Sequence, residues 1–541
     1  MKKLALVLSL LAACVPAVTQ EFSAKAYSGG IFRPRSSPAQ LSAPGGLEDH
    51  VVSGKLRLTL DDAVALALIN NSDVNASRAQ SELANFSVQR AHAPFDTVFT
   101  SSFAPTRSNS PSTSTLSGAA TLSTLNQSSQ AQVSQQFQTG TNLSVGLNST
   151  RATTNSSFAT VNPSFSSGLA FSLSQPLWRR AGLFPNRAPI VIAQRGVRQS
   201  RATLEAQVSD VVFRAVGQYW DAVQARKNME VLQKSLDLAQ ASYQRDKRAL
   251  ELGALPPLDI YRSESQVAQR KIAVLQAEYA RKQAEDALRQ TIGADLDARA
   301  GALDLELTEK IETESTLAAV DLREALSTAL KNRQELEAQR QQLAVDDTNV
   351  KLANNNLKPD LNLSASYISN GLGGTVFDTS GATPIVVSTG GFADSLSQLG
   401  GFKFPTYGMT LRLQMPLHNS SAQADLGSAL VSKRRDLYQM RSLEQSIALQ
   451  IKNSVHDLEL AELVMAAAKT SRDLAEKNLS AEERKYQLGA QTIFFVLDAQ
   501  NQLSQAELSL VQAQIAYQKA LAELDHAEGT LLEKHQVTVK P

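Results

Sequence analysis

Hydrophobic and small residues recur at helical spacing in two long pairs of stretches. Each pair is expected to fold as a helical hairpin, over about 189–291 and about 422–528, with helices of up to sixty-odd residues that reach roughly 100 Å. In the last helix the apolar and small positions alternate three and four apart, at Leu503, Ala506, Leu510, Ala513, Tyr517, Ala520, Leu524 and Ala527. This spacing predicts a left-handed coiled-coil seam, and its alanines allow the helices to approach closely.

Two other regions alternate apolar and polar residues with a period of two, which predicts β-strands. They lie at about 97–178 and about 359–416, and each is expected to form one β-hairpin. The alternating positions of the first region include Leu143, Val145, Leu147, Leu169, Phe171 and Leu173. An apolar face of this kind suits either a soluble core or lipid. Because Arg107 and Arg151 are the only charged residues between Thr97 and Trp178, lipid is favoured.

The strand count predicts an oligomer. Two hairpins supply four strands, whereas a closed barrel needs about eight or more. Two copies would supply eight strands and three copies twelve, and only the larger barrel leaves an aqueous lumen. We therefore expect a homotrimer with a twelve-stranded membrane β-barrel and with long coiled helices packed side by side in a wall. The fold class is mainly α with membrane β.

Matched segments indicate a tandem repeat. Leu252-Gly253-Ala254 and Leu488-Gly489-Ala490 lie 236 residues apart, as do Gly293 and Gly529. The repeats are expected at 57–293 and 321–532. The remaining segments are expected to be a linker at 18–56, a linker or equatorial segment at 294–320 and a tail at 533–541.

The N-terminus predicts export. Residues 1–17 combine Lys2 and Lys3 with a short apolar run, as secretory signals do. The only cysteine, Cys14, follows Leu11-Ala12-Ala13 and resembles a lipobox cysteine that becomes lipidated. The alternative is that Cys14 is one more apolar residue of the signal. No later stretch has the twenty or so apolar residues of a membrane helix, so we expect strands to enter the membrane.

Composition excludes several functions. The formal net charge of +1 gives no basic stripe for nucleic acid. The six histidines show no metal-ligand spacing, and no nucleotide-binding or nucleophile motif occurs. We therefore expect no enzyme activity, no metal and no cofactor.

The order of these parts, each occurring twice, resembles the outer-membrane efflux protein family of the TolC type, from about Leu58 to Leu532. The matching segments are Leu60-Asp61-Asp62-Ala63-Val64-Ala65-Leu66-Ala67-Leu68, Lys358-Pro359-Asp360-Leu361-Asn362-Leu363, Gln175-Pro176-Leu177, Met415-Pro416-Leu417, Tyr486-Gln487-Leu488-Gly489 and Val496-Leu497-Asp498-Ala499-Gln500. The resemblance implies a trimer with a twelve-stranded outer-membrane β-barrel that continues into a periplasmic α-helical barrel. The tips of that α-helical barrel close its tunnel and meet a periplasmic adaptor protein, which is itself bound to an inner-membrane pump.

The resemblance also implies roles for residues at the tips. Asp259 and Tyr486 match a latch of the closed state, and Gln491 stands where the family has a latch arginine. Asp498 matches a ring acid at the pore constriction, and Phe495 replaces its companion acid with an apolar side chain. The alternative for Asp498 is an ordinary solvated helix residue. The tip residues expected to contact the adaptor are Gly253, Ala254, Gly489 and Ala490.

The sequence therefore predicts a passive outer-membrane exit duct of a tripartite efflux or type I secretion system. Its location would be the outer membrane of a Gram-negative-type bacterium, with the helices extending into the periplasm and the strands in contact with lipid. The competing hypothesis is a non-conducting, lipid-anchored coiled-coil protein of the envelope. That alternative explains the helices but leaves the charge-poor strands without a role.

Overall fold

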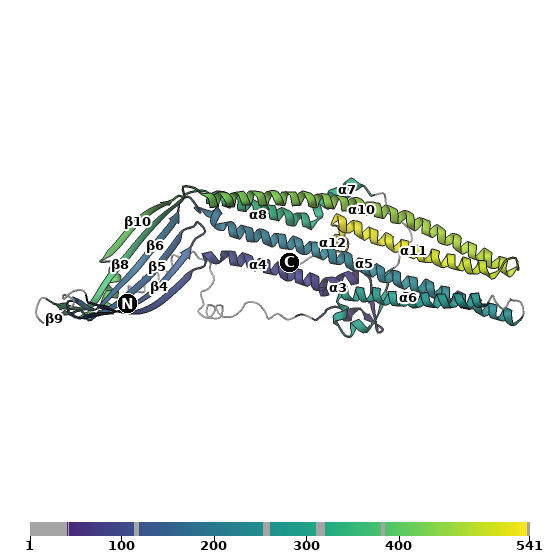
Figure 1. Ribbon diagram of the computed structural model, residues 1–541, viewed down its shortest axis with the longest axis horizontal. Helices are drawn as coiled ribbons and strands as arrows, with labels where there is room; N and C mark the ends of the chain where they lie inside the picture. The colour runs from purple at the N-terminus through teal and green to yellow at the C-terminus, as the bar shows by residue number, and fades with distance from the viewer. Residues whose placement is uncertain are drawn as a thin grey trace. The chain divides into compact units, whose positions relative to one another are not determined.

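The computed structural model describes residues 41, 43–112, 118–252, 260–309, 320–379 and 385–537. These residues form two compact units, which are described separately. In the described part, the first unit comprises residues 87–193 and 345–432, and the second comprises 41–86, 194–344 and 433–537. The first unit holds the long strands, and the second holds the paired helices (Figure 1).

The first unit is built on a seven-stranded antiparallel sheet. Six strands follow one another in the order β10-β8-β6-β5-β4-β3, and the short β9 pairs only with β8 (Figure 1). The strands are β3 (Val98–Pro111), β4 (Thr121–Gln136), β5 (Asn142–Thr154), β6 (Val161–Pro176), β8 (Asp360–Asp378), β9 (Ile385–Ser388) and β10 (Pro405–Gln414). Sequence neighbours therefore pair within 98–176, and β6 and β8 join the two halves of the sheet.

The expectation of a single hairpin over 97–178 is wrong, because this region forms four strands. A tight turn at Gly140 joins β4 to β5, where a φ of +89° favours glycine and Gly140 N–H donates to Phe137 O at 2.9 Å. The strands that pattern analysis missed are β3 and β4, which are dominated by Ser, Thr, Asn and Gln. Each chain therefore carries six long strands instead of the four expected.

Residues of like polarity line up across all six long strands. Direct cross-strand partners, which share one face of a sheet, form a hydrophobic row of Phe99, Val133, Val145, Phe171, Tyr367 and Tyr407. On the other face, an adjacent row continues from β4 to β10 as Ser134, Ser144, Ser172, Ser366 and Gly408. One face of the sheet therefore carries a hydrophobic row that is continuous over six strands, the other face carries a polar row, and the β4–β5 hairpin takes part in both.

A short helix covers one end of the sheet. Helix α9 (Phe392–Leu399) approaches β8 so closely that a Cβ at Gly371 would lie 2.0 Å from Ser395 O. Ser395 also bonds to Ser167 of β6, with 2.9 Å between the two Oγ atoms, and the Phe392 ring lies 6.3 Å from that of Phe165. This helix fixes the loop between β9 and β10 against β6 and β8.

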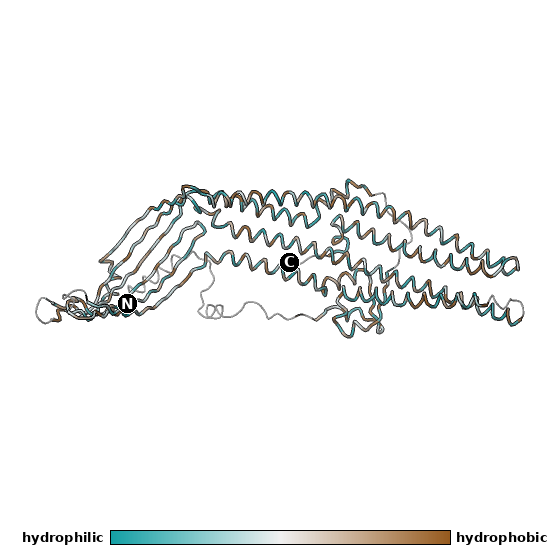
Figure 2. The backbone as a smooth tube through the Cα atoms, in the orientation of Figure 1, coloured by the Kyte–Doolittle hydropathy of each residue, from teal (hydrophilic) through white to brown (hydrophobic). Residues whose placement is uncertain are grey.

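Long helices dominate the chain outside the sheet. They are α3 (Leu60–Asn70), α4 (Ser72–His92), α5 (Leu183–Glu251), α6 (Ile260–Ile292), α7 (Leu322–Asn332), α8 (Gln334–Asn356), α10 (Ser420–Gln487) and α11 (Ile493–Glu528). No helix within the described residues has an apolar run long enough to cross a membrane. Figure 2 shows hydrophobic and hydrophilic positions interspersed along them.

The coiled-coil seam predicted on α11 is confirmed. Ala513, Tyr517, Ala520, Leu524 and Ala527 of the seam are buried against α7, α8 and α10. Their partners on α10 are Ile447, Ile451, Val455, Leu458, Ala461 and Met465. Because the alanines occupy little space, the two helices of this hairpin pack through one continuous buried stripe.

Both repeats use the same packing at the end of their second long helix. Gly293 follows α6 with a φ of +71°, and a Cβ there would lie 2.6 Å from Asn70 Cβ at the end of α3. Gly529 follows α11 with a φ of +73°, and its Cβ would lie 3.1 Å from the backbone of Asn332 at the end of α7. These matched contacts support the duplication inferred from the sequence.

The linker expected at 18–56 contains strands near its end, so that part of the prediction is wrong, whereas the linker or equatorial segment expected at 294–320 has one short strand packed with the helices. In the second unit β1 (Val51–Val52) pairs with β2 (Lys55–Leu58), and β2 runs parallel to β7 (Asp304–Leu307). Leu56, Leu58 and Leu305 are buried in the core with α3, α5 and α6. The alternation is only four residues long in each strand, which is why these segments read as linkers.

Smaller elements complete the described chain. They are the 3-10 turns η1 (Glu48–His50), η2 (Ala93–Phe95), η4 (Ala294–Leu296) and η5 (Ala300–Ala302), and the helix α12 (Leu531–Lys534). The expected tail begins within α12, and Val537 packs against the core of the second unit.

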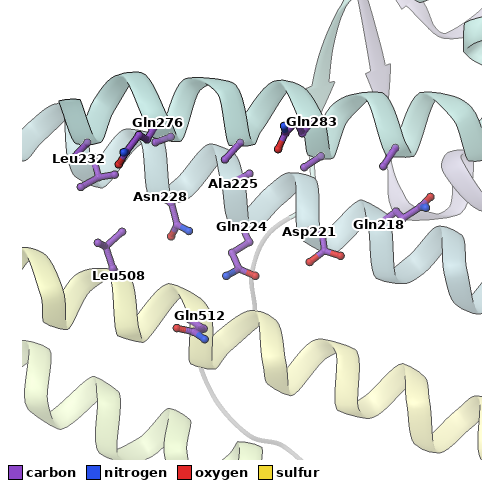
Figure 3. Close-up of a pocket in the computed structure, with 15 residues that line it drawn as sticks. Gln218, Asp221, Gln224, Ala225, Asn228, Leu232, Gln276, Gln283, Leu508 and Gln512 are labelled. Atoms are coloured by element: carbon purple, nitrogen blue, oxygen red, sulfur yellow. The ribbon is translucent and has the colours of Figure 1, made fainter. Parts of the chain in front are cut away.

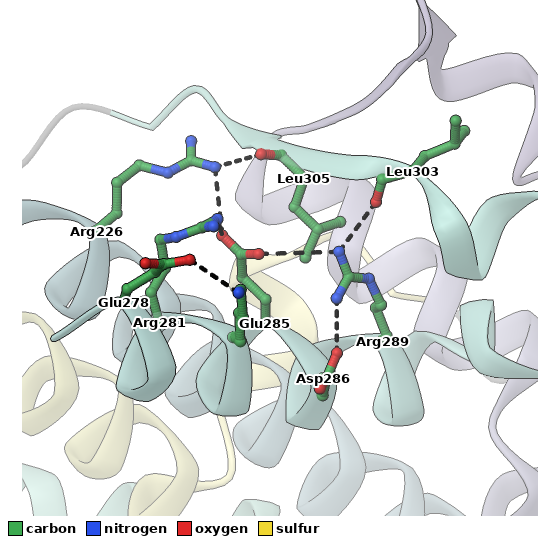
Figure 4. Close-up of polar contacts among 9 residues, drawn as sticks. Arg226, Glu278, Arg281, Glu285, Asp286, Arg289, Leu303 and Leu305 are labelled. Carbon is green, nitrogen blue, oxygen red and sulfur yellow. Dashed lines mark hydrogen bonds and ion pairs between the residues drawn. The ribbon is translucent and has the colours of Figure 1, made fainter. Parts of the chain in front are cut away.

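A buried carboxylate ties the segment around β7 to the helices (Figure 4). The Glu285 side chain is 3% exposed, and Arg281 Nη1 lies 2.6 Å from its Oε1. Arg226 and Arg289 also reach Glu285, at 3.6 and 3.8 Å. Arg289 donates to Leu303 O at 2.9 Å, and Arg226 donates to Leu305 O. The arginines therefore hold both Glu285 and the backbone that enters β7.

Replacing the glycine that follows the second long helix of a repeat is expected to destabilise the protein. Gly529→Ala should lower stability by roughly 1–3 kcal/mol, because alanine is strained at a positive φ and its Cβ would meet Asn332. The midpoint of thermal unfolding, followed by circular dichroism in detergent, measures this loss. Gly217→Ala within α5 is the control, since its Cβ meets nothing within 4 Å. Equal midpoints for the two variants would contradict the assigned role of Gly529.

Removing the buried charge should cost more than removing an exposed one. Glu285→Gln removes the anion that three arginines share, although Arg289 keeps its pair with Asp286, and we expect a loss of about 3 kcal/mol. Glu278→Gln on the same helix is the matched control, because that exposed residue pairs only with Lys282 and its loss should be unmeasurable. The same thermal unfolding measurement compares the two. A Glu285→Gln variant as stable as the control would show that the network contributes nothing.

Candidate functional site

The tip between α10 and α11 is shaped by Gly489. Its φ of +70° ends α10, and Gly489 N–H donates to Tyr486 O at 2.9 Å while Ala490 N–H donates to Lys485 O at 2.9 Å. A Cβ at Gly489 would meet nothing within 4 Å. The glycine is therefore required by the backbone conformation of the turn, and the space around it is open.

Apolar side chains stand exposed at this tip. Leu488 is 79% exposed, Phe494 52% and Phe495 46%. Beneath them Leu479, Ile493, Val496, Leu497 and Ala499 form a small core with Tyr486 and Leu503 at its edge. The tip is thus a rigid end of the hairpin that presents hydrophobic surface to its surroundings.

Phe495 and Asp498 lie on one exposed face of α11. Their spacing of three residues puts them one turn apart, and Gln502 Nε2 donates to Asp498 Oδ2 at 2.7 Å from the next turn. The opposite face carries Val496, Leu497 and Ala499, which are buried. The two residues predicted to line a constriction are therefore brought together.

Tyr486 contacts an arginine of the other helical hairpin. The Arg245 guanidinium carbon of α5 lies 4.9 Å from the centre of the Tyr486 ring, a cation–π distance. Arg245 is also 3.6 Å from the buried Asp246, which accepts a hydrogen bond from Ser263 of α6. The ring face of Tyr486 thus contacts a cation that is itself held by the first hairpin.

Two further arginines of α6 reach α11. The Arg262 guanidinium carbon lies 6.0 Å from the Phe494 ring, and Arg270 donates to the Asn501 side chain. Partial burial lowers the pKa of the Arg270 guanidinium. With Arg245, these residues place three cations of the first hairpin against the second. We call Arg245, Arg262 and Arg270 the tip arginines.

The structure places some of the predicted site residues and not others. Gly489, Ala490, Tyr486, Phe495 and Asp498 lie at or next to the described tip. Gln491 is half-buried beside them, and its Oε1 has no hydrogen-bond partner among the described residues. The other predicted residues, Cys14, Gly253, Ala254 and Asp259, lie outside the described residues.

Sequence reasoning missed the tip arginines. On a helix with many charged residues, the sequence gives no reason to expect that an arginine is anything but solvent-exposed. The residue that each tip arginine contacts also lies more than 200 positions away in the chain. A usable signal was the excess of aromatic residues at 486–495 in a chain with only 6% aromatics, because such rings attract guanidinium groups.

A polar groove of about 740 Å³ lies between α5, α6 and α11 (Figure 3). Asp221, its one carboxylate, is paired with Lys519 at 2.5 Å. The other polar lining residues are the amides Gln218, Gln224, Asn228, Gln276, Gln283 and Gln512. Among the described residues no group of three His, Cys, Asp or Glu side chains is placed to hold a metal ion. The groove offers hydrogen bonds and no general base positioned beside a nucleophile.

Known proteins resemble this chain along most of its length. The family model for the outer membrane efflux protein matches residues 127–294 and 325–530. Outer membrane protein TolC of Vibrio cholerae is 23% identical over 385 residues, which is 69% of this chain and 78% of that protein.

Two solved structures show the same fold. The CmeC outer membrane channel of Campylobacter jejuni has a TM-score of 0.61 at 15% identity, covering 92% of this chain and 94% of that chain. The MtrE outer membrane channel of Neisseria gonorrhoeae, in its open state, has a TM-score of 0.58 at 17% identity, covering 87% and 89%.

Proposed function

The chain belongs to the outer membrane efflux protein family, and on that premise we propose that it is the passive exit duct of a tripartite efflux or type I secretion system. The family consists of outer membrane channels and not of enzymes. The observation that carries the proposal is the sheet of the first unit, in which one hydrophobic row continues over six strands. A face of this kind suits contact with the lipid of the outer membrane.

Channels of the TolC type work with adaptor and pump partners. For this chain we propose a homotrimer whose tips meet a periplasmic adaptor protein, and an inner-membrane pump supplies the energy. The exposed Leu488 and the open space at Gly489 support this contact, since a partner helix can approach the turn closely. Because Gly253 and Ala254 match Gly489 and Ala490 in the sequence repeat, we propose the same adaptor contact for them. Lipidation of Cys14 remains a prediction.

The constriction is proposed to be built from α11. In a trimer, three copies of Asp498 would form a ring of negative charge, and three copies of Phe495 would form an apolar ring one turn away. Their shared exposed face supports this arrangement, because nothing in the described chain covers it. The Asp498 ring would favour the passage of cations, and the Phe495 ring would exclude water when the aperture is narrow.

The latch is proposed to differ from the one that the resemblance implied. Tyr486 was expected to bond through its hydroxyl to Asp259, whereas the described contact is between its ring and Arg245. Phe494 and Asn501 add contacts to Arg262 and Arg270. We propose that the tip arginines hold the two hairpins of one chain together in the closed state.

Single-channel conductance in a planar bilayer tests the duct and the Asp498 ring together. The wild-type protein should give a small, cation-selective conductance, and Asp498→Ala should reduce cation selectivity several-fold because three charges leave the aperture. Glu507→Ala, farther along α11, is the control for a general loss of negative charge. A folded trimer that never conducts, even after Arg245→Gln, would contradict the duct. Unchanged selectivity in Asp498→Ala would contradict the ring alone.

A second conductance experiment separates a ring contact from a hydroxyl bond at Tyr486. Tyr486→Leu removes the cation–π contact and should raise conductance several-fold by loosening the tip. Tyr486→Phe keeps the aromatic face and should leave conductance near the wild-type value. If Tyr486→Phe opens the channel as much as Tyr486→Leu does, the hydroxyl is the element that holds the tip closed.

A further inference from the structure

The sheet of the first unit ends in two unpaired edges. β3 pairs only with β4, and β10 pairs only with β8. All residues of β3 and of β10 are exposed, whereas most residues of the strands between them are partly covered. Among the described residues nothing lies against either edge. Each edge therefore presents a row of backbone N–H and C=O groups without partners.

These edges cannot stay open in the outer membrane. Lipid offers no hydrogen bonds, so a strand edge exposed to it leaves its backbone groups unsatisfied. Six strands are too few to close on themselves, since closed barrels need about eight. The occupant that fits an edge of β3 is an antiparallel strand with the same alternation of faces. The β10 edge of a second copy of this chain supplies such a strand.

The parity of the strand count favours this pairing. Each neighbouring pair in the sheet is antiparallel, so with six long strands β3 and β10 run in opposite directions. Rotation about a common axis does not change the direction of a strand along that axis. When β3 of one copy lies beside β10 of the next copy, the two strands are therefore antiparallel, like every other neighbouring pair in the sheet. Pro105 lacks an N–H, so the part of β3 that can pair continuously is Val98–Ala104.

The hairpin of β4 and β5 belongs to the wall of the sheet and is not an external loop. Val133 and Val145 continue the hydrophobic row from Phe99 to Phe171 without a break. The two strands have 16 and 13 residues, and about 10 are enough to cross a bilayer. A turn of five residues between them, closed by Gly140, leaves no room for a separate domain.

We infer that three copies of this chain close into one barrel of eighteen long strands, joined through β3 and β10, instead of the twelve-stranded barrel expected from four strands per chain. The inference rests on the trimer of the proposed function. At a strand spacing of about 4.8 Å and a tilt of about 40°, eighteen strands give a barrel about 36 Å across and twelve give about 24 Å. The outer opening is therefore about 1.5 times wider.

Cysteine pairs test which edges meet. Thr100 of β3 lies on the polar face, as do Thr406, Thr410 and Arg412 of β10. Thr100→Cys combined with a cysteine at one of those three positions should form a disulfide between copies. On non-reducing gels the bands should stop at three chains. Thr100→Cys with Leu411→Cys on the opposite face, and each single variant, are the controls and should not cross-link.

Two results of this experiment would overturn the inference. Absence of cross-links from every polar-face pair would show that the two edges do not meet. A ladder that stops at two chains or continues to four would contradict eighteen strands. Because the readout is covalent mass, it does not depend on conduction.

The width of the barrel tests the strand count directly. End-on electron microscopy of the full chain should show a strand ring of about 36 Å. Deleting residues 121–154 removes β4 and β5 but lets β3 pair with β6, and the ring of that variant should shrink about 1.5-fold. A full-chain ring of about 24 Å would overturn the inference even if the deletion variant fails to fold.

Conductance separates this inference from the proposed function. A cross-linked ring of three copies that conducts no ions would contradict the duct and leave the eighteen-stranded pairing standing. Conduction by an assembly with a twelve-stranded ring would support the duct and contradict the pairing.

Discussion

Backbone hydrogen bonding is the constraint on which the architecture of this protein depends. The helices satisfy their backbone groups internally, so they can extend for more than sixty residues without a neighbour at every position. The sheet satisfies its groups only between strands, and among its six long strands only β3 and β10 lack a second neighbour. The unpaired strand edges therefore determine how copies of the chain assemble, whereas the helices need only pack side by side through their small residues.

The parts of the fold that the sequence predicted are those with a long repeated pattern. The α11 seam covers eight positions, and no alternative period fits them, so its burial was predictable. β4 escaped prediction because its residues are largely Ser and Gln, and only its cross-strand partners show that Val133 belongs to an apolar row. β2 and β7 escaped because each has four residues and its parallel partner lies about 250 positions away.

The same distinction applies to the tip. Gly489 was predictable because a positive φ after a helix favours glycine. Phe495 and Asp498 were predicted only through the family resemblance, and their spacing of three explains why they lie on one helix face. The contact of Arg245 with Tyr486 was not predictable, because it depends on how two hairpins far apart in sequence pack together. The resemblance to the family assigned Asp259 as the latch acid. That assignment gives no information about which side chain contacts the ring of Tyr486 in this chain.

The two repeats differ at equivalent positions of their hairpins. The separation of 236 residues aligns Tyr486 with Leu250, and it aligns Asp498 with Arg262. At equivalent helical positions, therefore, one repeat carries a cation and the other an anion, and an aromatic ring stands where its counterpart has an aliphatic side chain. The contacts between the hairpins use this difference, because Arg245 and Arg262 of the first repeat meet aromatic rings of the second, while Asp498 faces outward from α11.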